Sequence, residues 1–355
     1  MKQQDLPKTR HMGVLVEAHK AEVHTEPIEP LGPCDVLLQM QTNNICTTDY
    51  QQWMGLREHQ GYPMAGGHEW SGVIIAKGAD VVDTLQIGDR VSGMGKGCAQ
   101  CTDCLSGHQE LCRNTKSVIV NGYYGGRGFS NYKVSHQTDV VKLNGNVTPA
   151  EVGFMEPVAT VVSGIELVRV HPGHTVVVVG SGTMGLLNAQ VAKAYGAKVI
   201  MTDVTDKKIE RARSMGIGEV LDGRDSGVAE RVMELTDGIG ADIVIPAVGS
   251  SVAYEQSMQM LRKIGGRMLL FAAGYPKPEL KVDPNEIHYR RMEIIGTGNA
   301  NMGDFAKAAF LISNQLIDCK YSLEGKVFAL RDIQQAFEAA ATPDTYRITV
   351  DLQQI

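Results

Sequence analysis

Long apolar runs are missing from the sequence. None approaches the roughly 20 residues that a membrane-spanning helix requires, and the first dozen residues carry lysine and arginine but no apolar stretch of the signal-peptide kind. The sequence also lacks an excess of basic charge, since it has 34 lysine and arginine residues and 40 acidic residues. A nucleic-acid-binding protein would need a clustered basic face. We therefore expect a soluble, cytoplasmic protein that binds neither membranes nor nucleic acid.

Cysteine is scarce, and its placement is uneven. Four of the seven cysteines fall between Cys98 and Cys112, while Cys34, Cys46 and Cys319 stand alone. A secreted scaffold held by disulfides would be shorter, with its cysteines spread more evenly. In a cytosolic chain, a tight group of cysteines is interpreted first as a set of metal ligands. The group therefore predicts a metal site.

Two hydrophobic patterns divide the chain. About the first 150 residues contain short alternating stretches between glycine and proline turns, which is typical of an all-β barrel or sandwich. Examples are Asp35–Met40, Trp70–Ala76 and Asp89–Val91. After about residue 156, apolar strands alternate with stretches of helical periodicity. That alternation predicts an α/β domain with a doubly wound parallel sheet.

The strands expected in this second part have short, continuous apolar runs. They are Val176–Val179, Lys198–Asp203, Asp242–Ile245, Arg267–Phe271 and Glu293–Ile295. Beyond them we expect two helices and a last strand that rejoins the first domain. These are Asp304–Ser313, Arg331–Ala341 and Arg347–Leu352.

Three glycines mark a turn that binds a dinucleotide. Gly180, Gly182 and Gly185 fit the G-x-G-x-x-G pattern, after an expected strand and at the start of an expected helix. The first glycine permits the tight turn, the second lets the backbone approach the pyrophosphate, and the third allows close packing of helix and strand. The start of the helix, at Thr183 and Met184, offers free N–H groups to the phosphates.

Asp203 ends the next expected strand. An acidic side chain at this point binds the ribose hydroxyls of the adenosine and repels a 2′-phosphate, so we expect NAD rather than NADP. Lys208 lies close enough in the sequence to soften that preference, and Lys208 and Val248 complete the expected cofactor-binding residues. The alternative is that Asp203 only caps a helix or ends a strand in solvent.

Cys98, Cys101, Cys104 and Cys112 form a C-x2-C-x2-C-x7-C pattern. Four thiolates at this spacing suit one tetrahedral zinc ion without an open position, which predicts a structural site. The zinc would order a lobe, residues 95–113, that has little apolar content. An iron–sulfur cluster is the competing interpretation, although the spacing fits neither ferredoxin pattern.

Three separate fragments carry a second group of ligand-type residues. A thiolate, an imidazole and one or two carboxylates can hold zinc and leave a position for water or substrate. The fragments are Asn44–Asp49 with Cys46, Gly66–Gly72 with His68 and Glu69, and Met155–Pro157 with Glu156.

The order of these motifs resembles that of the zinc-containing medium-chain dehydrogenase/reductase superfamily, over nearly the whole chain. Gly88–Val91 stands between the histidine fragment and the cysteine lobe, as in that superfamily. The resemblance implies a GroES-like β-barrel catalytic domain, residues 1–156 and 297–355. It implies that a Rossmann NAD-binding domain, residues 157–296, is inserted into it. It also implies a homo-oligomer, either a dimer or a tetramer.

Glu156 and Pro157 resemble the sorbitol (polyol) and butanediol dehydrogenase branch, in which glutamate stands where classical alcohol dehydrogenases have a third cysteine ligand. The resemblance implies a catalytic zinc held by Cys46, His68 and either Glu69 or Glu156. The zinc would act as a Lewis acid on a substrate hydroxyl, and the nicotinamide would take the hydride. The expected substrate is a secondary alcohol: a polyol, a sugar alcohol or a sugar acid.

The same resemblance assigns two supporting roles. Thr48 would accept a hydrogen bond from the substrate hydroxyl, and Asp49 would orient His68. Two positions depart from the pattern, because Thr47 replaces a usual glycine and Gln51 replaces a histidine that passes the proton to solvent in many members. Glutamine does not titrate, so the route of the proton stays open.

Alternatives remain for the substrate and for the activity. 2,3-Butanediol and L-threonine dehydrogenases belong to the same superfamily, and Arg57 or Arg127 would suit an anionic substrate such as a sugar acid or phosphate. A non-catalytic zinc- or nucleotide-binding protein would be expected to lack a zinc ligand or a motif glycine. A zinc-free quinone-type reductase would not carry the four ligand-type residues of the catalytic group.

Overall fold

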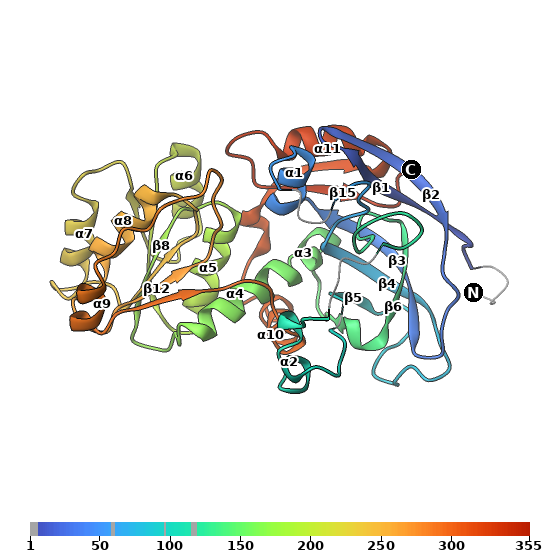
Figure 1. Ribbon diagram of the computed structural model, residues 1–355, viewed down its shortest axis with the longest axis horizontal. Coiled ribbons are helices and arrows are strands. Elements are labelled where there is room, and N and C mark those ends of the chain that lie inside the picture. Colours follow the sequence, from blue (N-terminus) through green and yellow to red (C-terminus); the bar gives the residue numbers. More distant parts are fainter. Residues whose placement is uncertain (1–5, 58–60, 96, 115–118) are drawn as a thin grey trace. The chain divides into compact units, whose positions relative to one another are not determined.

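The computed structural model describes residues 6–57, 61–95, 97–114 and 119–355 and divides the chain into two compact units (Figure 1). Unit 1 comprises Met1–Ala159, Ala300–Gln315 and Leu323–Ile355. Unit 2 comprises Thr160–Asn299 and Leu316–Ser322. The second segment of unit 2 had been expected in the first domain. Lys96, within the expected zinc lobe, lies outside the described residues.

Unit 1 is built on a sheet in the order β14-β15-β3-β4-β5-β7, with β6 paired to β3. A hairpin of β1 (Thr9–Glu17) and β2 (Lys20–Pro27) accompanies it. The strands of the sheet are β3 (Asp35–Asn44), β4 (Glu69–Lys77), β5 (Arg90–Gly93), β6 (Tyr132–His136), β7 (Val140–Lys142), β14 (Leu323–Ala329) and β15 (Arg347–Asp351). The helices are α1 (Thr47–Trp53), α2 (Thr102–Leu105), α3 (Pro149–Gly153), α10 (Met302–Ser313) and α11 (Ile333–Ala340).

The core of unit 1 is formed by apolar side chains on the inward-facing side of its central strands. Val36, Leu38 and Met40 of β3 are buried, because every second side chain of a strand points to the same face. They join Trp70 and Ile74 of β4 in one apolar cluster. The cluster fixes the pairing of β3 with β4, since a slip of one residue would turn these side chains to the other face.

Unit 2 contains a parallel sheet in the order β10-β9-β8-β11-β12-β13. Its core comes from continuous apolar runs such as Val176–Val179, as expected for strands covered on both faces. α5 packs on β8 and β9, and α8 packs on β11. The strands are β8 (Thr175–Val179), β9 (Lys198–Asp203), β10 (Glu219–Asp222), β11 (Ile243–Pro246), β12 (Arg267–Leu270) and β13 (Glu293–Gly296). The helices are α5 (Thr183–Ala194), α6 (Asp206–Ser214), α7 (Val228–Leu235), α8 (Ser251–Met260) and α9 (Pro284–Arg290), while α4 (Met155–Leu167) begins in unit 1.

The expected fold class is confirmed: a β-rich domain accompanies a doubly wound parallel sheet. Among the described residues, no helix combines the length and the apolarity needed to cross a bilayer.

A buried ion network stabilises the outer part of unit 1. The Glu26 carboxylate accepts hydrogen bonds from Arg10 Nε at 2.7 Å and from Arg127 Nε at 2.6 Å. All three side chains are buried. Burial acts to raise the pKa of Glu26, but the two guanidinium groups hold it below its ordinary value of 4.5. Removing one member of such a network leaves an uncompensated buried charge.

We predict that Glu26→Gln lowers the free energy of unfolding by about 3 kcal/mol, because it leaves the buried Arg127 without its carboxylate partner and leaves Arg10 with Glu29 alone. Since the folded pKa lies below the unfolded value, the stabilisation is complete well above pH 4.5 and is lost as the pH falls through the folded pKa. Chemical denaturation at pH 7 and pH 4 measures both effects. Glu22→Gln, at an exposed carboxylate of the same strand, is the control. Equal stability of the two variants would contradict the prediction.

Candidate active site and nucleotide site

Strand pairing brings the ligand-type residues of unit 1 together. At one end of the sheet, Asn44 of β3 pairs with Glu69 of β4 and with Thr349 of β15. Cys46 follows β3 by two residues and His68 precedes β4 by one, so both emerge at that end. Asn44 secures the junction, because its side chain accepts a hydrogen bond from Thr349 Oγ1 at 2.8 Å and donates to the Ala150 carbonyl at 2.9 Å.

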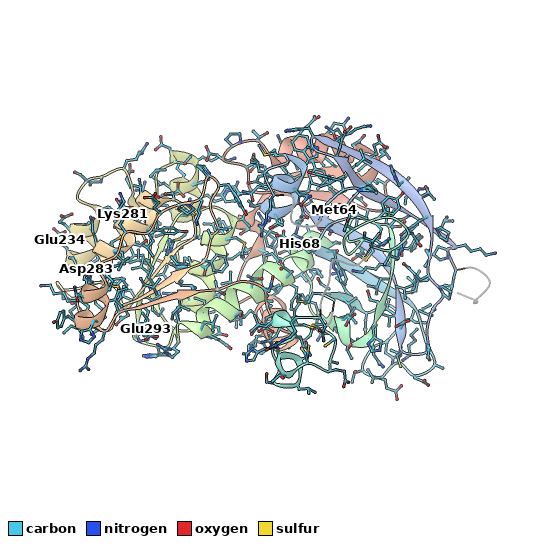
Figure 2. All side chains as sticks on the ribbon, viewed as in Figure 1. Met64, His68, Glu234, Lys281, Asp283 and Glu293 are labelled. Carbon is cyan, nitrogen blue, oxygen red and sulfur yellow. The ribbon has the colours of Figure 1, made fainter. Side chains whose placement is uncertain are left out.

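The sulfur of Cys46, a ring nitrogen of His68 and a carboxylate oxygen of Glu69 all lie within 4.8 Å of one another. His68 is labelled in Figure 2. A thiolate, an imidazole and a carboxylate are the donors that catalytic zinc takes from proteins, with a fourth position left for water or substrate. The chemistry of this group therefore fits zinc.

Glu156 lies outside that cluster of mutually close ligand atoms. It faces the same charges, however, because burial raises its pKa to about 7 while His68 acts to lower it and Glu69 acts to raise it. Two carboxyl groups thus serve the site differently: Glu69 within the cluster and Glu156 beside it.

Arg347, the first residue of β15, holds the Glu69 carboxylate. Its Nε lies 3.0 and 2.9 Å from the two Glu69 oxygens, and its Nη2 lies 2.7 Å from Oε1 and 3.3 Å from Cys46 Sγ. The side chains of Arg347 and Glu69 are both buried. A guanidinium in this forked geometry neutralises the carboxylate and fixes its plane. From the sequence, Arg347 was expected only as the start of a strand, because no local motif marks it.

His68 is held by Asp49. The Asp49 carboxylate accepts the backbone N–H of Cys46 at 3.0 Å and lies 3.5 Å from His68 Nδ1. Burial acts to lower the pKa of His68, but Asp49 and Cys46 raise it well above its ordinary value of 6.5. The contact to Nδ1 leaves Nε2 as the ring nitrogen for a metal, the arrangement in which a carboxylate orients a metal-binding histidine.

Thr48 stands on α1, next to Cys46, and its hydroxyl is engaged by Arg57. Arg57 Nη1 donates to Thr48 Oγ1 at 3.2 Å. The other arginine proposed for an anionic substrate, Arg127, is instead part of the buried Glu26 network and donates to the carbonyl of Val120 at 2.6 Å. Arg127 is therefore structural, and of these two arginines Arg57 is the one that lies beside a residue of the catalytic group.

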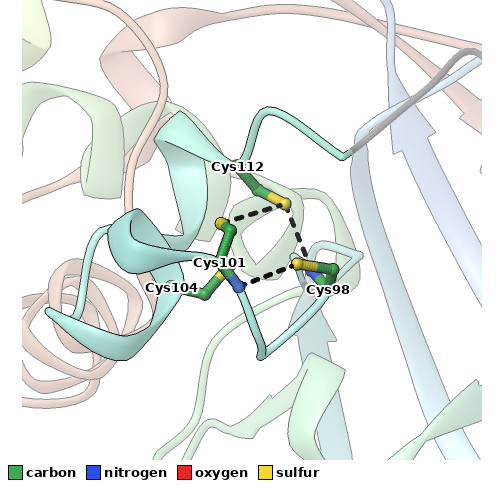
Figure 3. Close-up of side chains that lie close together, drawn as sticks. All are labelled: Cys98, Cys101, Cys104 and Cys112. Carbon is green, nitrogen blue, oxygen red and sulfur yellow. Dashed lines mark hydrogen bonds between the residues drawn. The ribbon is translucent and has the colours of Figure 1, made fainter.

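The four cysteines of the lobe converge (Figure 3). Their sulfur atoms lie within 4.8 Å of one another. The backbone N–H groups of Cys98 and Cys101 point to the sulfurs of Cys112 and Cys98, at 3.2 and 3.3 Å. Burial and the neighbouring thiols raise the pKa of Cys104 to about 12. Four thiolates this close together repel one another unless a cation lies among them, so the donor set fits one structural zinc ion.

The glycine motif opens a cavity in unit 2. The cavity has a volume of about 310 Å³ and is lined by Gly180, Gly182, Asp203, Lys208 and Val248, among others. A Cβ at Gly185 would lie 1.8 Å from the Gly180 carbonyl oxygen, which explains why the third motif position must be glycine. Nothing lies within 4 Å of a Cβ at Gly182, so the backbone there is open to a ligand.

Asp203 also binds backbone N–H groups, a role that the sequence did not indicate. Its Oδ2 accepts the N–H of Ser181 at 2.5 Å, and its Oδ1 accepts the N–H groups of Val204 and Thr205 at 2.8 and 2.9 Å. One carboxylate therefore lines the cavity and also holds the glycine turn against the end of β9. Thr183 and Met184 begin α5, which starts at this turn.

Comparisons with known proteins agree with the fold and the site. The alcohol dehydrogenase GroES-like domain family matches residues 32–145, and the zinc-binding dehydrogenase family matches residues 183–314. The chain is 28% identical to the sorbitol dehydrogenase of Halalkalibacterium halodurans over 336 residues, 92% of this chain and 94% of that protein. It is 30% identical to the L-threonine 3-dehydrogenase of Deinococcus deserti over 343 residues, 93% and 94% of the two chains.

Among solved structures, the alcohol dehydrogenase TADH from Thermus sp. ATN1 has the same fold, with a TM-score of 0.82 at 22% identity over 96% of this chain and 99% of that one. The fold and the clustered ligand residues define a zinc-containing alcohol dehydrogenase. The chain belongs to the zinc-containing medium-chain dehydrogenase/reductase superfamily, as its motifs predicted, and its relatives include the sorbitol dehydrogenase of the polyol branch.

We predict that Cys104→Ser removes one zinc ion per chain and leaves a second in place, because the two ligand clusters share no residue. Native mass spectrometry and elemental analysis count the bound metal. Cys34→Ser is the matched control, since Cys34 belongs to neither cluster. An unchanged zinc content in Cys104→Ser would contradict the structural-zinc assignment.

Proposed function

We propose that the protein is a zinc-dependent dehydrogenase that oxidises a secondary alcohol, a polyol, sugar alcohol or sugar acid, with NAD as the hydride acceptor. The observation that carries the proposal is the convergence of the Cys46 sulfur, the His68 ring and the Glu69 carboxylate within 4.8 Å. Thr48, two residues after Cys46, adds a hydroxyl for the substrate. The cavity at the glycine turn supports the nucleotide.

Cys46, His68 and Glu69 hold the catalytic zinc in this proposal, and Glu156 stands beside it. When bound, zinc supplies Lewis-acid chemistry that lowers the pKa of an alcohol hydroxyl, and the nicotinamide takes the hydride. Arg347 neutralises the Glu69 carboxylate, so the protein charge left to balance the zinc is chiefly that of the Cys46 thiolate.

The proton of the substrate hydroxyl is received at Thr48 Oγ1. That oxygen accepts from Arg57, so its own hydrogen is free to be donated onward. The neighbouring Gln51 has an amide side chain and takes no proton, which leaves water as the carrier from this point. Asp49 keeps the His68 ring in its orientation throughout, because its carboxylate is itself fixed by the Cys46 backbone.

The preference for NAD rests on Asp203. Its carboxylate is a lining group of the cavity and carries a negative charge where a 2′-phosphate would lie. Lys208 lines the same cavity and offers a donor to a ribose hydroxyl. We also infer a cytoplasmic homo-oligomer, a dimer or tetramer, by similarity to the superfamily; light scattering of the purified protein tests the assembly.

A second candidate substrate is L-threonine, favoured by the 30% identity to the threonine dehydrogenase. 2,3-Butanediol is a further alternative within the superfamily. A panel of polyols, sugar acids, diols and threonine separates these substrates.

We predict that the protein reduces NAD at the expense of a polyol or sugar acid, monitored at about 340 nm, the absorption band of the reduced nicotinamide. Removing zinc with a chelator abolishes the reaction and adding zinc restores it. His68→Ala lowers kcat at least about 100-fold, because the Lewis acid contributes several kcal/mol. His136→Ala, at a partly exposed histidine of β6, is the control. No turnover of any secondary alcohol by a zinc-replete sample would overturn the proposal.

We predict that Asp203→Asn narrows the discrimination between the cofactors. The ratio of kcat/KM for NAD to that for NADP falls by about 10-fold or more, because a charge-assisted hydrogen bond contributes about 1.5–3 kcal/mol. The asparagine retains one oxygen to accept an N–H of the glycine turn. Asp206→Asn, which removes the same charge from an exposed neighbour, separates this effect from a general change of charge. An equal kcat/KM for NAD and for NADP in the unaltered protein would contradict the prediction.

A further inference from the structure

We propose that Arg57 binds a carboxylate of the substrate, so that the protein acts on hydroxy acids of the sugar-acid class in preference to neutral polyols. This inference rests on the proposed function, because it narrows the substrate class of the same active site.

The first observation is the position of the Arg57 guanidinium. Arg57 Nη1 lies 3.2 Å from Thr48 Oγ1, the oxygen that receives the substrate hydroxyl. A substrate oxygen at an ordinary hydrogen-bond distance of about 2.7 Å from Thr48 lies no more than about 6 Å from Arg57 Nη1. A carboxylate a few carbon atoms along the substrate chain therefore reaches the guanidinium.

The second observation is that no carboxylate of the described residues pairs with Arg57. Within the described part of the chain, Arg57 forms a hydrogen bond to the Thr48 hydroxyl and has no acidic partner. A guanidinium carries five N–H donors in a planar fork. One of these donors is used by Thr48 among the residues that the structure describes, and Arg57 is only partly exposed.

Two other arginines, Arg127 and Arg347, are already paired with carboxylates of the protein. Arg127 is held by the buried Glu26, and Arg347 is held by the buried Glu69. Arg347 binds its carboxylate through two nitrogens, and Arg127 binds Glu26 through Nε while its Nη atoms donate to backbone carbonyls. Arg57 has the same geometry without that partner, which is the condition expected of a guanidinium whose carboxylate arrives with the substrate.

A neutral polyol forms weaker interactions with the Arg57 guanidinium than a carboxylate does. Hydroxyl oxygens accept from a guanidinium, but they carry no charge and do not match both arms of the fork. A bidentate carboxylate adds charge-assisted hydrogen bonds and fixes the orientation of the substrate chain relative to Thr48. Arg57 thus selects the acid and places its carbinol at the catalytic group.

The test compares matched pairs of substrates: each hexitol and the aldonate of the same configuration, with a carboxylate in place of one terminal hydroxymethyl group. The zinc-replete protein is compared with Arg57→Met, Arg57→Lys and the control Arg331→Met, which removes an exposed arginine of the same unit. The measured quantity is the ratio of kcat/KM for the acid to that for the polyol. Thermal unfolding confirms that every variant is folded.

In the unaltered protein and in Arg331→Met the acid is the better substrate. In Arg57→Met the kcat/KM for the acid falls about 10- to 100-fold, mainly through KM, because a charged hydrogen-bond partner is lost. The kcat/KM for the polyol falls less, because the polyol loses only the contact of Arg57 with Thr48, so the ratio of acid to polyol falls. Arg57→Lys recovers part of the acid activity, since lysine keeps the charge and loses the fork.

Three outcomes overturn the inference while the proposed function stands: a wild-type preference for the neutral polyol, an equal loss on acid and polyol in Arg57→Met, or a preference for a hexitol phosphate. Turnover of no alcohol at all defeats the proposed function instead. In that case calorimetric titration of aldonate into the protein decides the role of Arg57. Binding that Arg57→Met abolishes supports the carboxylate site, and binding that is absent or unchanged overturns it.

Discussion

The buried ion pair of Arg347 and Glu69 is the interaction on which the catalytic cluster depends. A carboxylate as deeply buried as Glu69 is costly without a partner, and its partner is 278 residues away in the sequence. The pair forms only when β15 returns to β3 in the register that sets Thr349 against Asn44. On the other side of β3, the pairing with β4 sets Asn44 against Glu69 and so brings Cys46 and His68 to the same end of the sheet. Folding of unit 1 and assembly of the metal ligands are therefore a single event.

Much of the architecture could be predicted from hydrophobic pattern. The strand expected at Lys198–Asp203 has those bounds, and the apolar run at Val176–Val179 lies within β8. Elements with weak patterns were missed. The helix α1 is short and polar, so its periodicity is masked, and its start is set by Asp49 accepting the Cys46 N–H rather than by an apolar face. The strand β14 was missed as well, because only Ala329 among its residues is buried and its pairing partner β15 lies beyond an intervening helix.

Some residues of the sites could also be predicted from the sequence, and others could not. Spacing alone was enough for the four cysteines of the lobe, because neighbouring ligands in a short loop must converge. Cys46, His68 and Glu69 were identified from separate fragments by resemblance, and the structure places their donor atoms together. Arg347 and the contact between Arg57 and Thr48 were beyond sequence reasoning, since each depends on tertiary packing and neither belongs to a local motif. The second function of Asp203, as the brace of the glycine turn, was hidden for the same reason.

That second function limits how the protein can evolve. The carboxylate that lines the cavity also ties Ser181 to the end of β9, so the surface of the cavity and the stability of the glycine turn depend on one side chain. A lineage that replaces Asp203 with a residue lacking an acceptor oxygen must therefore also supply another partner for the Ser181 N–H. Substitutions that keep an oxygen at this position are the ones open to a single step.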